Sequence, residues 1–81
     1  MEAAEIYDAM TQILRDVFDD EQLVATPTMT AEDVVGWDSL AHIRVALTVE
    51  RLFKVRFSSD EIGNVQNVGE FVDLIRSKLP A

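Results

Sequence analysis

Ser39 has the clearest potential for chemistry, because it follows Asp38 where a loop gives way to a long helical pattern. A serine at a helix start commonly caps the helix by accepting hydrogen bonds from free backbone N–H groups. Asp38 can fill that role instead, which would leave the Ser39 hydroxyl free. A helix start carries a partial positive charge, so a phosphate ester on Ser39 would be favourably placed. Two interpretations therefore stand at this point, a simple cap and an attachment point for a phosphate group.

Other reactive residue types are too few to build a catalytic site. The chain has no cysteine, and His42 is its one histidine, so a nucleophile and base pair cannot be assembled. We interpret His42 as a packed histidine at the core-side margin of its helix, since no second ligand is spaced to join it around a metal. The acidic run at residues 19–21 lacks the alternating ligands and glycine of a calcium loop. We expect no enzyme activity and no metal site.

Three longer helices are predicted by apolar residues that recur at helical spacing. The first covers residues 3–18, the second runs from Leu40 to Phe53, and the last starts at residues 67–70. The apolar stripe of the first consists of Ile6, Met10, Ile13, Leu14, Val17 and Phe18, and that of the last consists of Val68, Phe71, Val72, Ile75 and Leu79.

A short helix and a long loop complete the pattern. Ser58-Ser-Asp-Glu61 resembles a capping box, and the helix that it starts is stopped by Gly63-Asn64. Residues 22–38 have no sustained period and form a loop, in which residues 30–33 can cap one short turn. Residues 54–57 are an extended linker, because a lone strand has no partner. The loop can be pinned to the core by Leu23, Met29 and Val34. The predicted fold class is all-α, a small bundle of three longer helices plus one short helix, with a long loop between helices one and two.

The second helix carries more apolar surface than one packing face needs. One stripe, suited to the core, consists of Val45, Ala46, Val49, Leu52 and Phe53, and the other, roughly opposite, consists of Leu40, Ile43 and Leu47. Arg44 and Arg51 flank the second stripe, as a polar rim flanks an apolar contact patch. Either both stripes are buried in a small bundle, or the second is exposed for a partner.

The charge distribution narrows the classes of partner. The net charge is −8, which disfavours nucleic acid and membrane insertion and favours basic proteins as partners. Residues 1–38 hold ten acidic residues against Arg15, whereas residues 39–57 hold four basic residues against Glu50. The absence of cysteine, an acidic start and the lack of a long apolar run predict one cytoplasmic domain over residues 1–81, acting as a monomer.

Residues 36–43, Gly-Trp-Asp-Ser-Leu-Ala-His-Ile, resemble the phosphopantetheine attachment motif of acyl carrier proteins, in which Asp-Ser-Leu begins the second helix. The resemblance extends over nearly the whole chain, through the acidic first helix, the long loop, Glu50-Arg-Leu-Phe53, the short helix and residues 68–75. In this context Gly36, Trp37, Asp38 and Leu40 flank the attachment serine.

The resemblance implies a free-standing carrier whose Ser39 is esterified by a phosphopantetheinyl transferase, which takes 4′-phosphopantetheine from coenzyme A with magnesium. Acyl groups would then travel as thioesters between acyl-loading and acyl-processing enzymes of fatty-acid-like, polyketide-like or other specialised biosynthesis. Leu40, Ile43 and Leu47 match the partner-facing positions of the family. Arg44 and Arg51, however, stand where acidic residues are frequent, which suggests a specialised carrier for an enzyme with an acidic docking surface.

Two alternatives remain beside this interpretation. An aminoacyl or peptidyl carrier uses the same arm, although residues 37–40 are more similar to the acyl type. A helical interaction module would use the stripe of Leu40, Ile43 and Leu47 for docking and carry no modification on Ser39.

Overall fold

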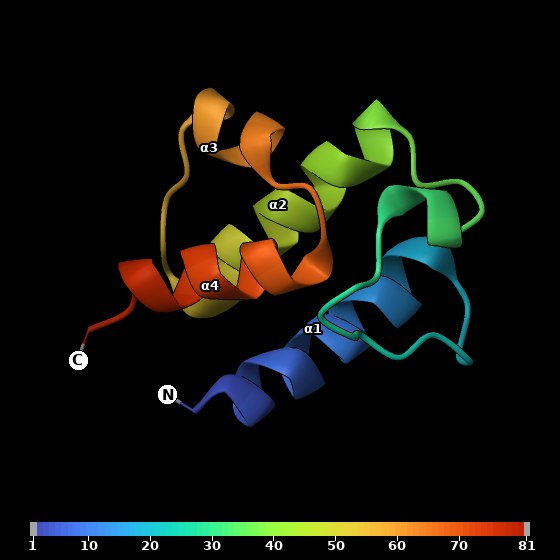
Figure 1. The fold of residues 1–81 in the computed structure, drawn as a ribbon, viewed down its shortest axis with the longest axis horizontal. Helices are drawn as coiled ribbons and strands as arrows, with labels where there is room; N and C mark the ends of the chain where they lie inside the picture. The colour runs from blue at the N-terminus through green and yellow to red at the C-terminus, as the bar shows by residue number, and fades with distance from the viewer. Residues whose placement is uncertain (1, 81) are drawn as a thin grey trace.

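The computed structural model describes residues 2–80, which form four α-helices and one 3-10 turn. The helices are α1 (Ala3–Phe18), α2 (Ser39–Phe53), α3 (Ser59–Asn64) and α4 (Val68–Lys78), and the turn, η1 (Ala31–Asp33), lies between α1 and α2. No strand occurs in the part of the chain that the structure describes. The predicted all-α class, with three longer helices, one short helix and a long loop after the first, is confirmed (Figure 1).

Side-chain caps set the helix starts close to the predicted positions. Ser58 Oγ accepts a hydrogen bond from the Glu61 N–H at 3.1 Å, and Glu61 Oε1 accepts one from the Ser58 N–H at 2.8 Å, which confirms the capping box of α3. Asn67 Oδ1 caps α4 by accepting from the Glu70 N–H at 2.8 Å. The helix α2 begins at Ser39, one residue earlier than predicted.

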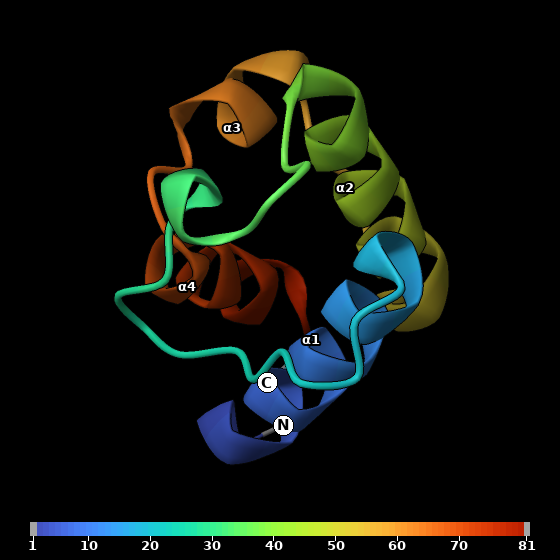
Figure 2. The same ribbon diagram turned by 90° about the vertical axis from the view of Figure 1, so that its right-hand side faces the viewer.

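The core lies between α1, α2 and α4, which surround the interior in Figure 2. No polar or charged side chain within residues 2–80 is fully buried, so removal of apolar surface from water is the main force that holds these helices together. Of the predicted stripes, Val17, Phe18 and Leu79 are only partly buried. The core cluster consists of Ile6, Met10, Ile13, Leu14, Ala25, Val45, Ala46, Val49, Val68, Phe71, Val72 and Ile75.

The long connection between α1 and α2 is fastened to the helices at several points. The Arg15 side chain donates to the Leu23 carbonyl at 2.7 Å, and the Val68 and Gly69 N–H groups donate to the carbonyls of Met29 and Pro27. A Cβ at Gly69 would lie 2.8 Å from the Pro27 oxygen, so this close approach requires glycine. The predicted pinning of the loop is also confirmed, because Val34 is buried and Leu23 and Met29 pack against the core.

The structure corrects the prediction for Leu52, which the helical pattern places on the core face of α2. Its side chain is 57% exposed. It lies in a shallow hollow beside α1, which is also lined by Ala9 and Gln12. Periodicity gives the direction of a side chain around its helix axis, but it does not show whether a neighbouring helix covers that position.

The ends of α3 and α4 are joined by an ion pair. Lys78 Nζ lies 2.8 Å from Glu61 Oε2 and also donates a hydrogen bond to Oε1. The hydrogen bond from Lys78, followed by that from the Ser58 backbone, lowers the pKa of Glu61.

None of the helices in the described part of the chain is long and apolar enough to span a membrane.

Candidate attachment site

Ser39 is the first residue of α2, and its side chain is exposed. Asp38 is the N-cap, because its Oδ1 accepts a hydrogen bond from the Ala41 N–H at 2.8 Å. Within residues 2–80, the Ser39 hydroxyl has no hydrogen-bond partner. The cap therefore comes from Asp38, as the sequence suggested, and the serine oxygen is free for chemistry.

The backbone around Ser39 has unpaired N–H groups that can donate hydrogen bonds to an anion. The first backbone bond of the helix runs from the His42 N–H to the Asp38 carbonyl, and Asp38 also occupies the Ala41 N–H. The N–H groups of Ser39 and Leu40, the first two residues of α2, have no partner within the helix. They lie at its N-terminal end, where the helix dipole is positive. A phosphate on Ser39 Oγ fits this environment.

Gly36 and Trp37 set the direction from which the chain enters α2. Gly36 has a φ of +89°, a left-handed conformation that favours glycine over residues with a side chain. The Trp37 ring then packs on Phe18 at the end of α1, with ring centroids 5.3 Å apart. Trp37 thus acts as a hydrophobic anchor for the end of the loop.

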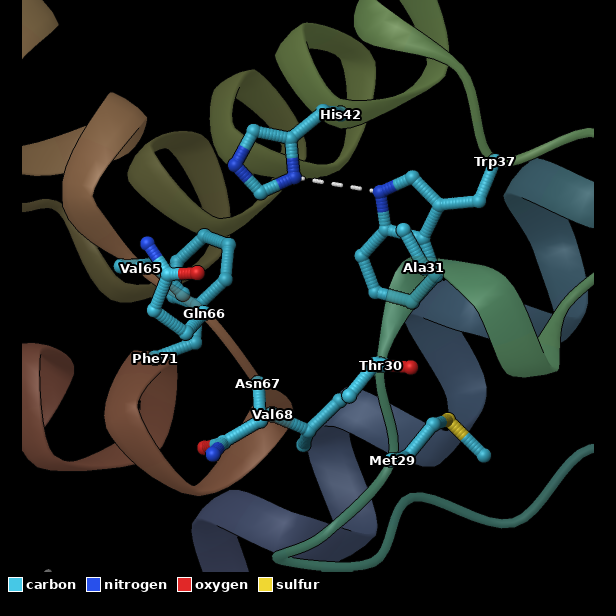
Figure 3. A pocket seen from close by; sticks show the side chains of 10 residues that line it. All are labelled: Met29, Thr30, Ala31, Trp37, His42, Val65, Gln66, Asn67, Val68 and Phe71. Carbon is cyan, nitrogen blue, oxygen red and sulfur yellow. Dashed lines mark hydrogen bonds between the residues drawn. The ribbon is translucent and has the colours of Figure 1, made fainter.

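Trp37 is also bonded to His42. Its Nε1–H donates to His42 Nδ1 at 3.1 Å (Figure 3), and His42 Nε2 lies 3.0 Å from the Ile62 carbonyl oxygen in α3. Since Nδ1 accepts and a carbonyl can only accept, the imidazole carries its proton on Nε2. His42 is half-buried and both of its ring nitrogens form hydrogen bonds, in agreement with the packed role inferred from the sequence.

A small cavity lies beside the Trp37–His42 bond, between α2, η1 and the segment that joins α3 to α4 (Figure 3). Its volume is about 40 Å³, and Phe71 and Val68 of α4 form part of its wall. Sites for small molecules typically measure roughly 300–1,000 Å³. The cavity is therefore too small to hold more than a few atoms.

The outer face of α2 is apolar and exposed. Leu40, Ile43 and Leu47 are 67%, 49% and 56% exposed, so the alternative in which both stripes of this helix are buried is excluded. Arg44 and Arg51 are exposed on either side of Leu47, and all three border a shallow hollow with Val17 of α1. In the described part of the chain, neither arginine forms an ion pair.

No three metal-ligating side chains come together within residues 2–80. The acidic residues 19–21 instead form a solvated surface, in which Asp19 ends α1 in a left-handed conformation and Asp20 bonds the Gln22 N–H. These residues do not contribute to the site at Ser39.

Known proteins are similar in sequence to this chain over most of its length. The acyl carrier protein of Coprothermobacter proteolyticus is 30% identical over 79 residues, which are 98% of this chain and 96% of that protein. The chain belongs to the acyl carrier protein family. The acyl carrier protein of Acidothermus cellulolyticus is 31% identical over 71 residues, covering 88% of this chain and 84% of that protein. No protein-family model matches the chain.

The fold of this acyl carrier protein matches that of a solved relative. The solution NMR structure of the holo acyl carrier protein from Geobacter metallireducens is 39% identical, with a TM-score of 0.83 over 89% of this chain and 83% of that chain. Acyl carrier proteins are carriers and not enzymes. The names of the relatives thus agree with the expectation that this chain is not an enzyme.

The structure brings the predicted motif residues together at the start of α2, with the predicted partner-binding residues along its outer face. Sequence reasoning missed the chain of bonds from Trp37 through His42 to Ile62. The signal available in the sequence was an aromatic donor two residues before Ser39 and an imidazole three residues after it. The position of Ile62, 20 residues further along, gave no such signal.

Proposed function

We propose that this acyl carrier protein carries acyl intermediates on a 4′-phosphopantetheine arm attached to Ser39 by a phosphopantetheinyl transferase. Taken from coenzyme A, the arm supplies a terminal thiol that holds acyl groups as thioesters. The observation that carries the proposal is the exposed Ser39 hydroxyl at the start of α2, which has no hydrogen-bond partner within residues 2–80.

The surroundings of Ser39 support a phosphate at this position. Asp38 holds the first turn of α2 through its bond to Ala41, so modification of Ser39 leaves the helix cap intact. The free N–H groups of Ser39 and Leu40 stabilise negative charge at the helix start. The chain has no cysteine, so the thiol of the arm has no competitor within the protein for an acyl group.

The acyl groups belong, in this proposal, to fatty-acid-like, polyketide-like or other specialised biosynthesis. The chain works as a monomeric carrier domain in the cytoplasm, passing between enzymes that load and process its cargo. The support is its family together with an acidic charge that disfavours nucleic acids as partners.

The partner enzymes dock on the outer face of α2. Leu40, Ile43 and Leu47 provide an exposed apolar contact close to Ser39, and Arg44 and Arg51 flank it without ion pairs within residues 2–80. An enzyme that buries this face needs an apolar socket with acidic residues on its rim. Such a partner differs from one that recognises an acidic α2.

Attachment is tested by incubating the protein with coenzyme A, magnesium and a broad-specificity phosphopantetheinyl transferase and measuring the intact mass. Ser59 is the matched control, because it is also an exposed first residue of a helix. Wild type and Ser59→Ala gain one arm, whereas Ser39→Ala gains none. Modification of Ser39→Ala, or failure of the wild type when a known carrier is modified in parallel, would contradict the proposal.

Docking is tested by charge reversal. Arg44→Glu with Arg51→Glu lowers kcat/KM of the acyl-loading enzyme at low salt, and the loss shrinks as salt screens the charges. Arg56→Glu with Arg76→Glu, at two exposed sites outside α2, is the control with the same net charge. Equal kinetics for the double variant and the control at low salt would remove the arginines from the interface.

A further inference from the structure

A row of aromatic rings crosses the molecule below the start of α2. Trp37 packs against Phe18 of α1, His42 lies 6.0 Å from Trp37 between ring centroids, and Phe71 of α4 lies 6.0 Å from His42. Phe57 continues the row against Phe71 at 5.7 Å. The row therefore joins α1, the loop end, α2 and α4 into one continuous layer.

Two hydrogen bonds fix the middle of this layer. Both nitrogens of His42 are engaged, one by the Trp37 indole and the other by the Ile62 carbonyl. We call Trp37 and His42, with these two bonds, the partition. Separating its members would leave polar groups without partners in a half-buried place, which is costly unless the incoming group replaces the bonds.

The partition is close in the sequence to the proposed attachment point and lines the cavity. His42 lies one helical turn after Ser39, and Trp37 lies two residues before it. The volume of this cavity is about 40 Å³, and hydrogen bonds from the Val68 N–H to Met29 and from the Gly69 N–H to Pro27 fasten the loop to the start of α4. An acyl chain that entered the cavity between the side chains of Trp37 and His42 would have to break the Trp37–His42 hydrogen bond (Figure 3).

We propose that Trp37 and His42 determine the class of cargo: their partition keeps short acyl groups outside the helices and admits a long alkyl chain only when the Trp37–His42 bond breaks. This inference rests on the proposed attachment of the arm to Ser39. An alkyl chain gains from burial in proportion to its methylene groups, whereas opening the partition has a fixed cost. A short acyl group cannot offset that cost. The structure as it stands thus suits a carrier of short acyl groups that are presented at the surface.

The test uses ¹⁵N-labelled protein with its arm attached, loaded in one sample with a butyryl group and in another with a dodecanoyl group. Intact mass first shows that the arm is present, so absence of the arm counts against the proposed function and not against the partition. NMR spectra then follow the indole N–H of Trp37 and the backbone amides of Val68, Phe71 and Val72.

Butyryl loading is expected to leave the indole and these amides of α4 unshifted. If dodecanoyl loading shifts the amides of α4, we expect the indole resonance to shift as well. If neither the amides nor the indole shift, the partition is closed to the dodecanoyl chain too, which agrees with the proposal. The proposal is overturned if butyryl loading shifts the amides of α4, or if dodecanoyl loading shifts them while the indole stays in place.

A pair of variants tests the partition independently of chain length. Trp37→Leu removes the indole, and we expect butyryl loading to shift the amides of α4 in this variant. Val35→Ala is the control, because Val35 lies in the same loop and is 99% exposed. A folded Trp37→Leu protein with unshifted amides would contradict the proposal. The comparison of the two acyl groups in the wild type remains decisive if this variant does not fold.

Discussion

The two apolar faces of α2 lie in opposite environments. On the inner face, Val45, Ala46 and Val49 are fully buried, whereas Leu40 and Leu47 on the outer face remain 67% and 56% exposed. The residue types are similarly apolar, but α1 and α4 cover only the inner face. The comparison shows that apolar residues of one helix can lie in two environments, a buried face that specifies the fold and an exposed face, which in our proposal contacts a partner.

The largest difference in stability is expected between a truncation on the inner face of α2 and one on its outer face. Val49→Ala lowers the free energy of unfolding by about 2 kcal/mol, because it removes two buried methyl groups and leaves a cavity. Leu47→Ala removes a larger group, yet it changes the free energy by less than about 0.5 kcal/mol because the site is exposed. Urea denaturation of both variants measures the difference. Equal losses would show that the outer face contributes to the fold.

A smaller effect separates the two residues at the start of α2. Asp38→Ala lowers the free energy of unfolding by about 1 kcal/mol, since it removes the cap on the Ala41 N–H. Ser39→Ala leaves stability nearly unchanged, because within residues 2–80 the hydroxyl has no hydrogen-bond partner. Thermal unfolding of the two variants tests this division of roles. A larger loss for Ser39→Ala would assign the cap to the serine.

The smallest effect concerns the exposed tie between α3 and α4, away from both faces of α2. The pKa of Glu61 is lowered in the folded state, chiefly by its hydrogen bond to Lys78, so its contribution to stability is present above the ordinary value of 4.5 and is lost as the pH falls through the folded pKa. Glu61→Gln should therefore melt slightly below wild type at neutral pH and converge with it in acid.

Asp60→Asn is the control for that experiment, because Asp60 is exposed beside Glu61 and forms no ion pair within residues 2–80. It should melt like wild type throughout. A Glu61→Gln difference that persists below the folded pKa would assign the effect to something other than the charged pair.

The sequence predicts the helices well because their signals are local. The apolar spacing of α1 and the caps at Ser58 and Asn67 each act within a few residues, and the structure places these elements where the pattern predicts them. The exposure of the Leu40 stripe could only be left open, because burial depends on which helices lie opposite.

The remaining features depend on contacts between distant segments. Leu52 lies at a core angle on its helix, but α1 does not cover it. The bond between His42 and Ile62 requires α3 to lie beside α2, and the close approach of Gly69 to Pro27 requires the loop to cross α4. Local patterns carry no information about these placements, which follow from the packing of the whole chain.

The most direct test of the central claim is to locate the arm by peptide mapping after treatment with the transferase and coenzyme A. Trypsin releases residues 16–44, in which Ser39 is the one serine, and residues 57–76, which contain Ser58 and Ser59. We predict the added arm on the first peptide, at Ser39, with the second peptide unmodified. An arm on residues 57–76, or no arm on either peptide, would contradict the account.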